Sequence, residues 1–362
     1  MSSREFFPGE EPELRDALAS YLAWLGGEAR KVDGFRALLL AGGYGRGEGG
    51  IFQEGGGSPP KLYNDLEFYL FGAGASRDEI KRWAHEGEAR LGIEIEIKVM
   101  SPDAFARARP SMFYYDLVSR HVLVAGDKAW VDSLPAELLQ AESIPVEEAS
   151  RLLVNRGMSL LRCARWAAGE MDLPPGFCAR ITAKLKLALA DAALCALGQY
   201  HWSCRERGGR LGELNDAPPH WEKLRAWHAE AVDFKLHPRH GGAPPSAWRE
   251  PLAELRRAWL STFLWVESRR LGQTFGSAAD YAAFRGRLFP ADPAWGNLLR
   301  QVRDLRRTSR VPFCGGDHPR SAIWKALALL MDGSPSGAQT AARLLGKPAL
   351  RGRELEERCR DC

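Results

Sequence analysis

The chain lacks several features that mark special classes of protein. None of its 362 residues belongs to an apolar run of about 18 residues, so no transmembrane helix is expected. The N-terminus has no apolar segment after its first charged residues, so we expect no signal peptide and a cytoplasmic location. Seven cysteines in a chain of this length are too few for a disulfide framework. The odd number leaves at least one free thiol, which suits a reducing compartment.

The sequence also has little net charge, only +4, which is too weak to indicate a nucleic-acid-binding protein by itself. The total conceals an asymmetry. Residues 1–135 hold 16 Lys+Arg and 21 Asp+Glu, a net charge of −5, whereas residues 136–362 hold 34 and 25, a net charge of +9. This charge asymmetry has two alternative explanations. Either the two parts of the chain have different tasks, or the chain has a general preference for arginine, with 39 Arg against 11 Lys.

The pattern of apolar residues changes near residue 135. Before it, short apolar or alternating runs predict strands, and longer runs of helical period predict helices between them, with a further helix starting at Ser101. The expected strands are 35–41, 66–71 and 93–99, and the expected helices are 13–28 and 78–91. After residue 135 only helices are expected, at 147–168, 178–200, 246–271, 294–309 and 318–331. We therefore predict an α+β chain, with a mixed sheet and helices in residues 1–135 and an all-α domain in residues 136–362.

A glycine-rich segment, Gly42 to Gly50, follows the first expected strand. Its second half matches the G-x-G-x-x-G pattern of dinucleotide-binding proteins, but no helix pattern follows it, and such a site requires a helix directly after the glycines. A Walker A loop is also absent. The glycines instead permit backbone N–H groups to approach phosphate oxygens closely.

Three acidic residues follow on two expected strands. Asp65 and Glu67 lie two residues apart, so in an extended chain they share a face, while Leu66 and Phe68 point to the core. Glu96 lies within the next strand. Three carboxylates on one face repel one another unless a cation is present, and hard oxygen ligands suit Mg²⁺. Two such ions bound to a nucleoside triphosphate would activate a hydroxyl and stabilise the leaving pyrophosphate.

The glycine turn followed by Asn64-Asp65-Leu66-Glu67 resembles the nucleotidyltransferase superfamily of DNA polymerase β-like fold. The turn is most similar to that of nitrogen-regulatory uridylyltransferases, and the D-x-E pair to that of aminoglycoside nucleotidyltransferases. The resemblance covers roughly residues 30–130 and implies a third carboxylate before a Ser-Pro helix start, which favours Glu96 over Glu94. Gly43 stands where many members have Ser, and the stretch before Asp65 is longer than in compact members.

Several other residues are open to two interpretations. Arg46 either binds phosphate or pairs with Glu48 across the turn. Lys184 and Asp191 lie seven residues apart on one helix, which indicates either a contact to the triphosphate oriented by Asp191 or a surface ion pair. His201 is either a base or a partly buried residue at a helix end, and the second interpretation is favoured.

Together these observations predict a Mg²⁺-dependent enzyme that transfers a nucleoside monophosphate, with ATP as the default donor, to a hydroxyl of a small molecule, sugar or protein. Asp65, Glu67 and Glu96 are the expected catalytic residues and metal ligands. The expected nucleotide-binding residues are Gly42, Gly43, Tyr44, Gly45, Arg46 and Lys184. Two alternatives stay open: a non-catalytic nucleotide-binding regulatory protein on the same fold, and an RNA- or DNA-modifying nucleotidyltransferase. No long basic and aromatic surface is evident, and no membrane partner is expected.

Overall fold

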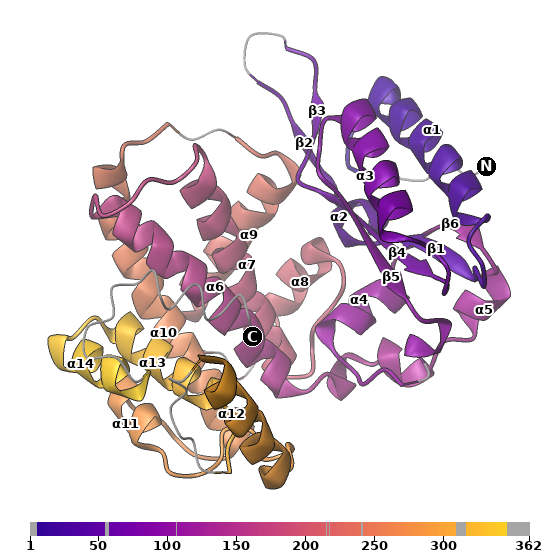
Figure 1. Cartoon of the computed structure of the whole chain (residues 1–362). Coiled ribbons are helices and arrows are strands. Elements are labelled where there is room, and N and C mark those ends of the chain that lie inside the picture. The colour runs from indigo at the N-terminus through magenta and orange to yellow at the C-terminus, as the bar shows by residue number, and fades with distance from the viewer. Residues whose placement is uncertain are drawn as a thin grey trace. The chain divides into compact units, whose positions relative to one another are not determined.

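The computed structural model describes residues 6–54, 58–105, 107–214, 216, 218–239, 242–308 and 316–345. It is a mixed α/β structure with a small sheet and a helical C-terminal region, which confirms the prediction at that level (Figure 1). None of the helices in the described ranges combines the length and the apolar character that crossing a membrane requires.

The chain forms two compact units that are not continuous in sequence. The first comprises Met1–Glu148, Leu197–Leu214 and Arg225–His240, and the second comprises Ala149–Ala196, Asn215–Leu224 and Gly241–Cys362. The single boundary expected after residue 135 therefore does not describe the first unit, which also takes in two later segments of the chain.

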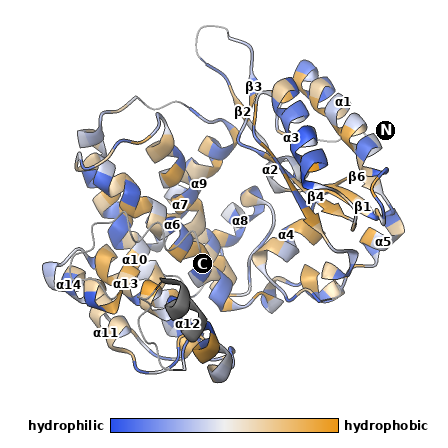
Figure 2. Ribbon diagram, in the orientation of Figure 1, coloured by the Kyte–Doolittle hydropathy of each residue, from blue (hydrophilic) through white to orange (hydrophobic). Residues whose placement is uncertain are grey.

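A four-stranded mixed sheet forms the centre of the first unit. Its strands are β1 (Ala37–Leu40), β4 (Leu66–Phe71), β5 (Ile95–Met100) and β6 (Val122–Gly126), in the order β5-β4-β1-β6. β4 and β5 are parallel, whereas β1 is antiparallel to both β4 and β6. The strands of this sheet are among the most apolar parts of the unit (Figure 2).

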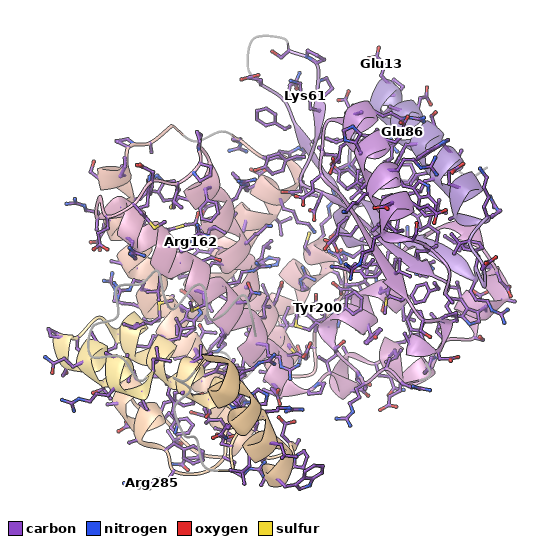
Figure 3. All side chains as sticks on the ribbon, in the orientation of Figure 1. Glu13, Lys61, Glu86, Arg162, Tyr200 and Arg285 are labelled. Atoms are coloured by element: carbon purple, nitrogen blue, oxygen red, sulfur yellow. The ribbon has the colours of Figure 1, made fainter. Side chains whose placement is uncertain are left out.

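Alternation along the strands supplies an apolar core on each face of the sheet. Leu38, Leu40 and Phe68 face helices α1 (Pro12–Ala29) and α3 (Arg77–Leu91). Polar residues of these helices, such as Glu13 and Glu86, point away from the sheet (Figure 3). The opposite face packs against a group of short helices, through residues that include Phe105, Leu117, Val131 and Leu138. Those helices are η1 (Pro102–Ala104), α4 (Met112–Ser119), α5 (Lys128–Asp132) and η2 (Ala136–Leu139).

Some elements of the first unit differ from the sequence prediction. The glycine segment begins with one turn of helix, α2 (Gly42–Gly45), and a two-stranded sheet of β2 (Gly50–Phe52) and β3 (Lys61–Tyr63) follows it. The helix expected after Ser101 is only the three-residue 3₁₀ turn η1. Helix α8 (Cys204–Leu211) and helix α9 (Trp221–Leu236), of which the part from Arg225 onward belongs to this unit, were not predicted.

The second unit is built from helices and connecting turns. They are α6 (Val146–Ala167), α7 (Phe177–Ala196), η4 (Pro245–Trp248), α10 (Arg249–Leu271), α11 (Ala278–Ala283), α12 (Ala294–Thr308), α13 (Arg320–Asp332) and α14 (Pro335–Leu344). The helix predicted over 178–200 ends at Ala196, because Gly198 has a left-handed backbone with φ of 68°. In the core, Trp259 and Phe263 of α10 stack with ring centroids 4.8 Å apart.

Candidate functional site

The parallel pairing of β4 and β5 brings two of the three predicted carboxylates opposite each other. Glu67 and Glu96 are partners in the strand register. Asp65 lies two residues before Glu67, immediately ahead of β4, while the intervening Leu66 is fully buried in the core as expected. Residues opposite each other on neighbouring strands point to the same face. The predicted acidic residues therefore gather at one end of the sheet, beside the glycine turn.

Glu67 is partly buried and lies against the glycine turn. A Cβ atom at Gly42 would stand 3.1 Å from the Glu67 carboxyl carbon, and Gly42 has a φ of +62°. Burial raises the pKa of Glu67, and the negative charges of Asp65 and Glu96 raise it further. The cations Arg46 and Lys98 oppose this rise. A positive charge nearby therefore stabilises the ionised form of Glu67.

Glu96 already has a cationic partner. Its Oε1 atom lies 3.0 Å from Nζ of Lys98, and about half of each side chain is exposed. Glu94 precedes β5, is exposed, and accepts a hydrogen bond from the Leu66 amide through its backbone carbonyl. The strand register thus places Glu96, and not Glu94, opposite Glu67.

The carboxylates offer the oxygen donors that Mg²⁺ prefers, and they lie close enough to influence one another's charge. They do not form a closed ligand set, since within the described ranges no three His, Cys, Asp or Glu side chains are arranged to hold a metal ion. The donor chemistry fits a divalent cation, and one of the three carboxylates, Glu96, is in contact with Lys98.

The glycine turn has a tightly packed backbone. Gly45 has no room for a side chain, because a Cβ there would lie 2.2 Å from the Leu40 carbonyl oxygen. Tyr44 is buried, and its hydroxyl accepts a hydrogen bond from the Tyr63 amide and donates one to the Gly50 carbonyl. The Tyr44 ring thus joins the turn to β2 and β3, so any contact of Tyr44 with a nucleotide would come from its backbone.

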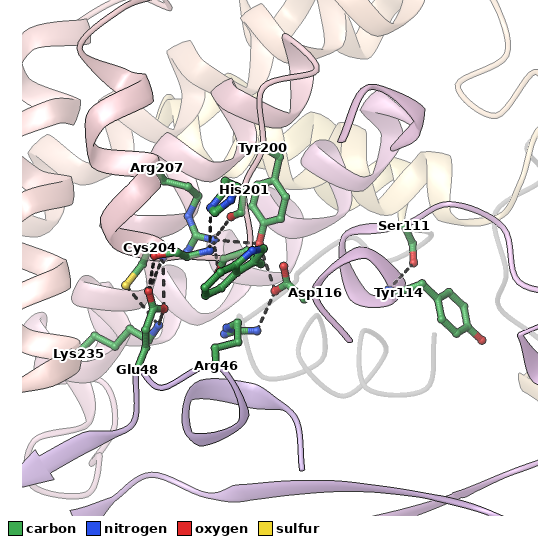
Figure 4. Close-up of polar contacts among 12 residues, drawn as sticks. Arg46, Glu48, Ser111, Tyr114, Asp116, Tyr200, His201, Cys204, Arg207 and Lys235 are labelled. Carbon is green, nitrogen blue, oxygen red and sulfur yellow. Dashed lines mark hydrogen bonds and ion pairs between the residues drawn. The ribbon is translucent and has the colours of Figure 1, made fainter. Parts of the chain in front are cut away.

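Arg46 and Glu48 do not pair with each other, which corrects one interpretation of the sequence. Arg46 donates a hydrogen bond of 2.9 Å to Asp116 in α4. Asp116 also accepts a bond from the Tyr200 hydroxyl, which in turn accepts one from the buried Arg207 (Figure 4). Arg46 is therefore held in place by a network of side chains, and its positive charge favours the ionised form of Glu67.

Glu48 instead joins the glycine turn to the two later segments of the unit. Its buried carboxylate accepts hydrogen bonds from the Ser203 hydroxyl at 2.7 Å, the Cys204 amide at 2.9 Å and Lys235 Nζ at 2.9 Å (Figure 4). Burial by itself would raise the pKa of Glu48, but Lys235 and these hydrogen bonds lower it to about 2. No residue of this cluster other than Glu48 was singled out from the sequence; the S-x-x-E pattern from Ser203 to Glu206 is the signal that marks the start of α8.

The remaining predicted residues lie elsewhere. Lys184 is exposed on α7 in the second unit, and Asp191 on the same helix is 8% exposed, so it is not a surface residue. Burial lowers the pKa of Arg156, and the charge of Asp191 opposes that change. His201 is partly buried, as expected, in the segment that follows α7 and precedes α8 in the chain, and its Nδ1 accepts a hydrogen bond from the Ser203 amide.

Comparisons with known proteins gave no match: no family model fits the chain, and neither curated proteins nor solved structures resemble it significantly.

Proposed function

We propose that the chain is a Mg²⁺-dependent nucleotidyltransferase that moves a nucleoside monophosphate from a triphosphate, with ATP as the default donor, to a hydroxyl of an acceptor. The observation that carries this proposal is the register pairing of Glu67 with Glu96, with Asp65 two residues before Glu67 and the glycine turn directly against the Glu67 carboxyl group. A phosphate-accessible turn beside clustered acids is what metal-assisted transfer from a triphosphate needs.

Each residue has a definite task in this proposal. Asp65, Glu67 and Glu96 would hold the cation, which supplies electrostatic stabilisation of the triphosphate and of the departing pyrophosphate. Glu96, half exposed at the sheet end, accepts the proton of the acceptor hydroxyl. Arg46, fixed by Asp116, adds positive charge beside Glu67.

The backbone of the glycine turn leaves room for a phosphate group in this proposal. Because Gly42 and Gly43 have no side chains, a phosphate group can approach the backbone there, whereas a Cβ at Gly42 would instead contact the Glu67 carboxyl group. The nucleotide is thereby oriented with its phosphates toward the carboxylates. The contact of Lys184 with the triphosphate stays a prediction from the sequence.

One observation favours a second candidate, a non-catalytic nucleotide-binding regulatory protein. Lys98 pairs with Glu96 at 3.0 Å, and the described residues contain no closed metal-ligand group. A lysine that permanently neutralised this carboxylate would remove one metal ligand and the proposed base. Such a protein would bind nucleotide with little dependence on Mg²⁺.

Thermal shift measurements distinguish these functions. The wild-type chain is heated with ATP, CTP, GTP or UTP, each with and without Mg²⁺, and Asp65→Asn is compared with it. Transfer chemistry predicts stabilisation that requires both a nucleotide and Mg²⁺ and that decreases strongly in Asp65→Asn. The matched control is Asp132→Asn, which removes an exposed aspartate of α5 from its ion pair with Lys128.

The result assigns the function as follows. Stabilisation without Mg²⁺, equal in the wild type and Asp65→Asn, would support the regulatory alternative. No stabilisation by any nucleotide, or the same loss in Asp132→Asn as in Asp65→Asn, would refute the proposed site. Release of pyrophosphate from the stabilising nucleotide, lost in Glu67→Gln, then tests catalysis itself.

A further inference from the structure

A single lysine lies among the clustered acids at the sheet end. Lys98 is two residues after Glu96 on β5, so both side chains emerge on the same face of the sheet. Its ammonium group is 3.0 Å from Glu96 and 5.7 Å from the centre of the Tyr69 ring, the register partner of Lys98 on β4. The positive charge of Lys98 also favours the ionised form of Glu67. One lysine thus balances charge on two of the three predicted metal ligands.

The ion pair between Lys98 and Glu96 is one that another cation can replace. Half of the Lys98 side chain and 44% of the Glu96 side chain are exposed, and an exposed ion pair of this kind is weak. A lysine side chain has several rotatable bonds, so its ammonium group can leave Glu96 without movement of the strand. A divalent cation and the ammonium group would both bind the Glu96 carboxylate and repel each other, so binding of one opposes binding of the other.

We infer that Lys98 is the internal counter-ion of the carboxylate site, an inference that rests on the proposed function. When a divalent cation binds the carboxylates, Lys98 would leave Glu96 and bind a phosphate of the incoming nucleotide. The Tyr69 ring beneath the lysine side chain keeps the released ammonium group at the sheet end. Lys98 therefore opposes binding of metal alone and favours binding of metal together with nucleotide.

The inference predicts effects of opposite sign in one variant. Lys98→Gln removes the competing charge, so Mn²⁺ alone should bind about twofold to fivefold more tightly, as the strength of exposed ion pairs indicates. The same variant lacks a charged hydrogen bond to phosphate, so ATP in the presence of Mg²⁺ should bind about tenfold more weakly or worse. Lys128→Gln is the matched control, since it removes an equally charged, exposed lysine from an ion pair with Asp132 in the same unit.

Mn²⁺ binding is measured from the electron paramagnetic resonance signal of the free ion, and ATP binding with Mg²⁺ by titration calorimetry. Tighter Mn²⁺ and weaker ATP binding in Lys98→Gln, with no change in Lys128→Gln, is the expected result. If Lys98→Gln binds Mn²⁺ no more tightly than the wild type, or binds ATP with Mg²⁺ equally well, the inference is wrong.

The failure of the proposed function gives a different result. If the wild type binds no more Mn²⁺ than Asp65→Asn does, the carboxylates do not form a metal site, and both the proposed function and the role of Lys98 are refuted. If Asp65→Asn loses Mn²⁺ binding but Lys98→Gln leaves it unchanged, only the role of Lys98 is refuted. Circular dichroism of Lys98→Gln should match the wild type, because the side chain is half exposed.

Discussion

Replacing Glu48 by Gln should loosen the attachment of α8 and α9 to the glycine turn. Glu48 accepts hydrogen bonds from Ser203 and Cys204 at the start of α8 and forms an ion pair with Lys235 of α9. A glutamine side chain retains one oxygen that can accept hydrogen bonds from α8 but leaves the Lys235 ammonium group without its negative partner. Removal of one member of a buried ion pair is strongly destabilising, since the other charge stays in a poorly solvated position.

The magnitude follows from the pKa of Glu48. Its value of about 2 in the folded chain, against 4.5 as the reference, corresponds to about 3 kcal/mol of stabilisation at pH 7. Because the folded-state pKa is lowered, this stabilisation is fully present above pH 4.5 and is lost as the pH falls toward 2. At pH 3 somewhat less than half of this stabilisation should persist.

Hydrogen exchange of the segment that contains the Cys204 amide reports on this contact directly, since that amide donates to Glu48 at 2.9 Å. A local measurement is preferable, because a chain of two compact units has no single well-defined unfolding free energy. Protection in Glu48→Gln should be about a hundredfold lower than in the wild type at pH 7, and the difference should become much smaller at pH 3. Glu13→Gln, at an exposed position of α1, is the control.

Two results would refute this reasoning. Equal protection of the wild type and Glu48→Gln at pH 7 would show that the ion pair with Lys235 contributes nothing to the attachment. A loss that is the same at pH 7 and pH 3 would show that the charge of Glu48 is not its origin.

Three further predictions concern the acids and the core. Asp65→Asn should lower the pKa of Glu67, because one of the charges that raise it is removed; a carbon-13 NMR titration of glutamate carboxyl groups checks this, and an unchanged Glu67 pKa would contradict it. Gly45→Ala should destabilise the first unit by more than about 1 kcal/mol, since a Cβ would lie 2.2 Å from the Leu40 carbonyl oxygen; a wild-type melting temperature would be inconsistent with that clash. Glu267→Gln should cost about 3–5 kcal/mol in the second unit, because it removes the buried carboxylate that forms an ion pair with Arg270; exchange of α10 amides measures the loss, and unchanged protection would disprove it.

The sequence by itself determined much of the first unit's secondary structure. The alternation of apolar and polar residues predicted that Leu66 and Phe68 face the core while Asp65 and Glu67 point the other way, and the burial of both apolar side chains confirms the first part. Helical periodicity likewise located α1, α3, α6 and α10 to within a few residues. These features depend on neighbours along the chain, so local patterns are sufficient to predict them.

Only the tertiary structure decided which strands and loops meet. Nothing in the alternation of β5 shows that Glu96, and not Glu94, is opposite Glu67; that follows from the parallel register with β4. The contacts of Glu48 with Ser203 and Lys235 join residues more than 150 positions apart, and they place α8 and part of α9 in the first unit. Such pairings depend on packing and charge compensation between distant segments, and for this reason no local pattern of residues predicts them.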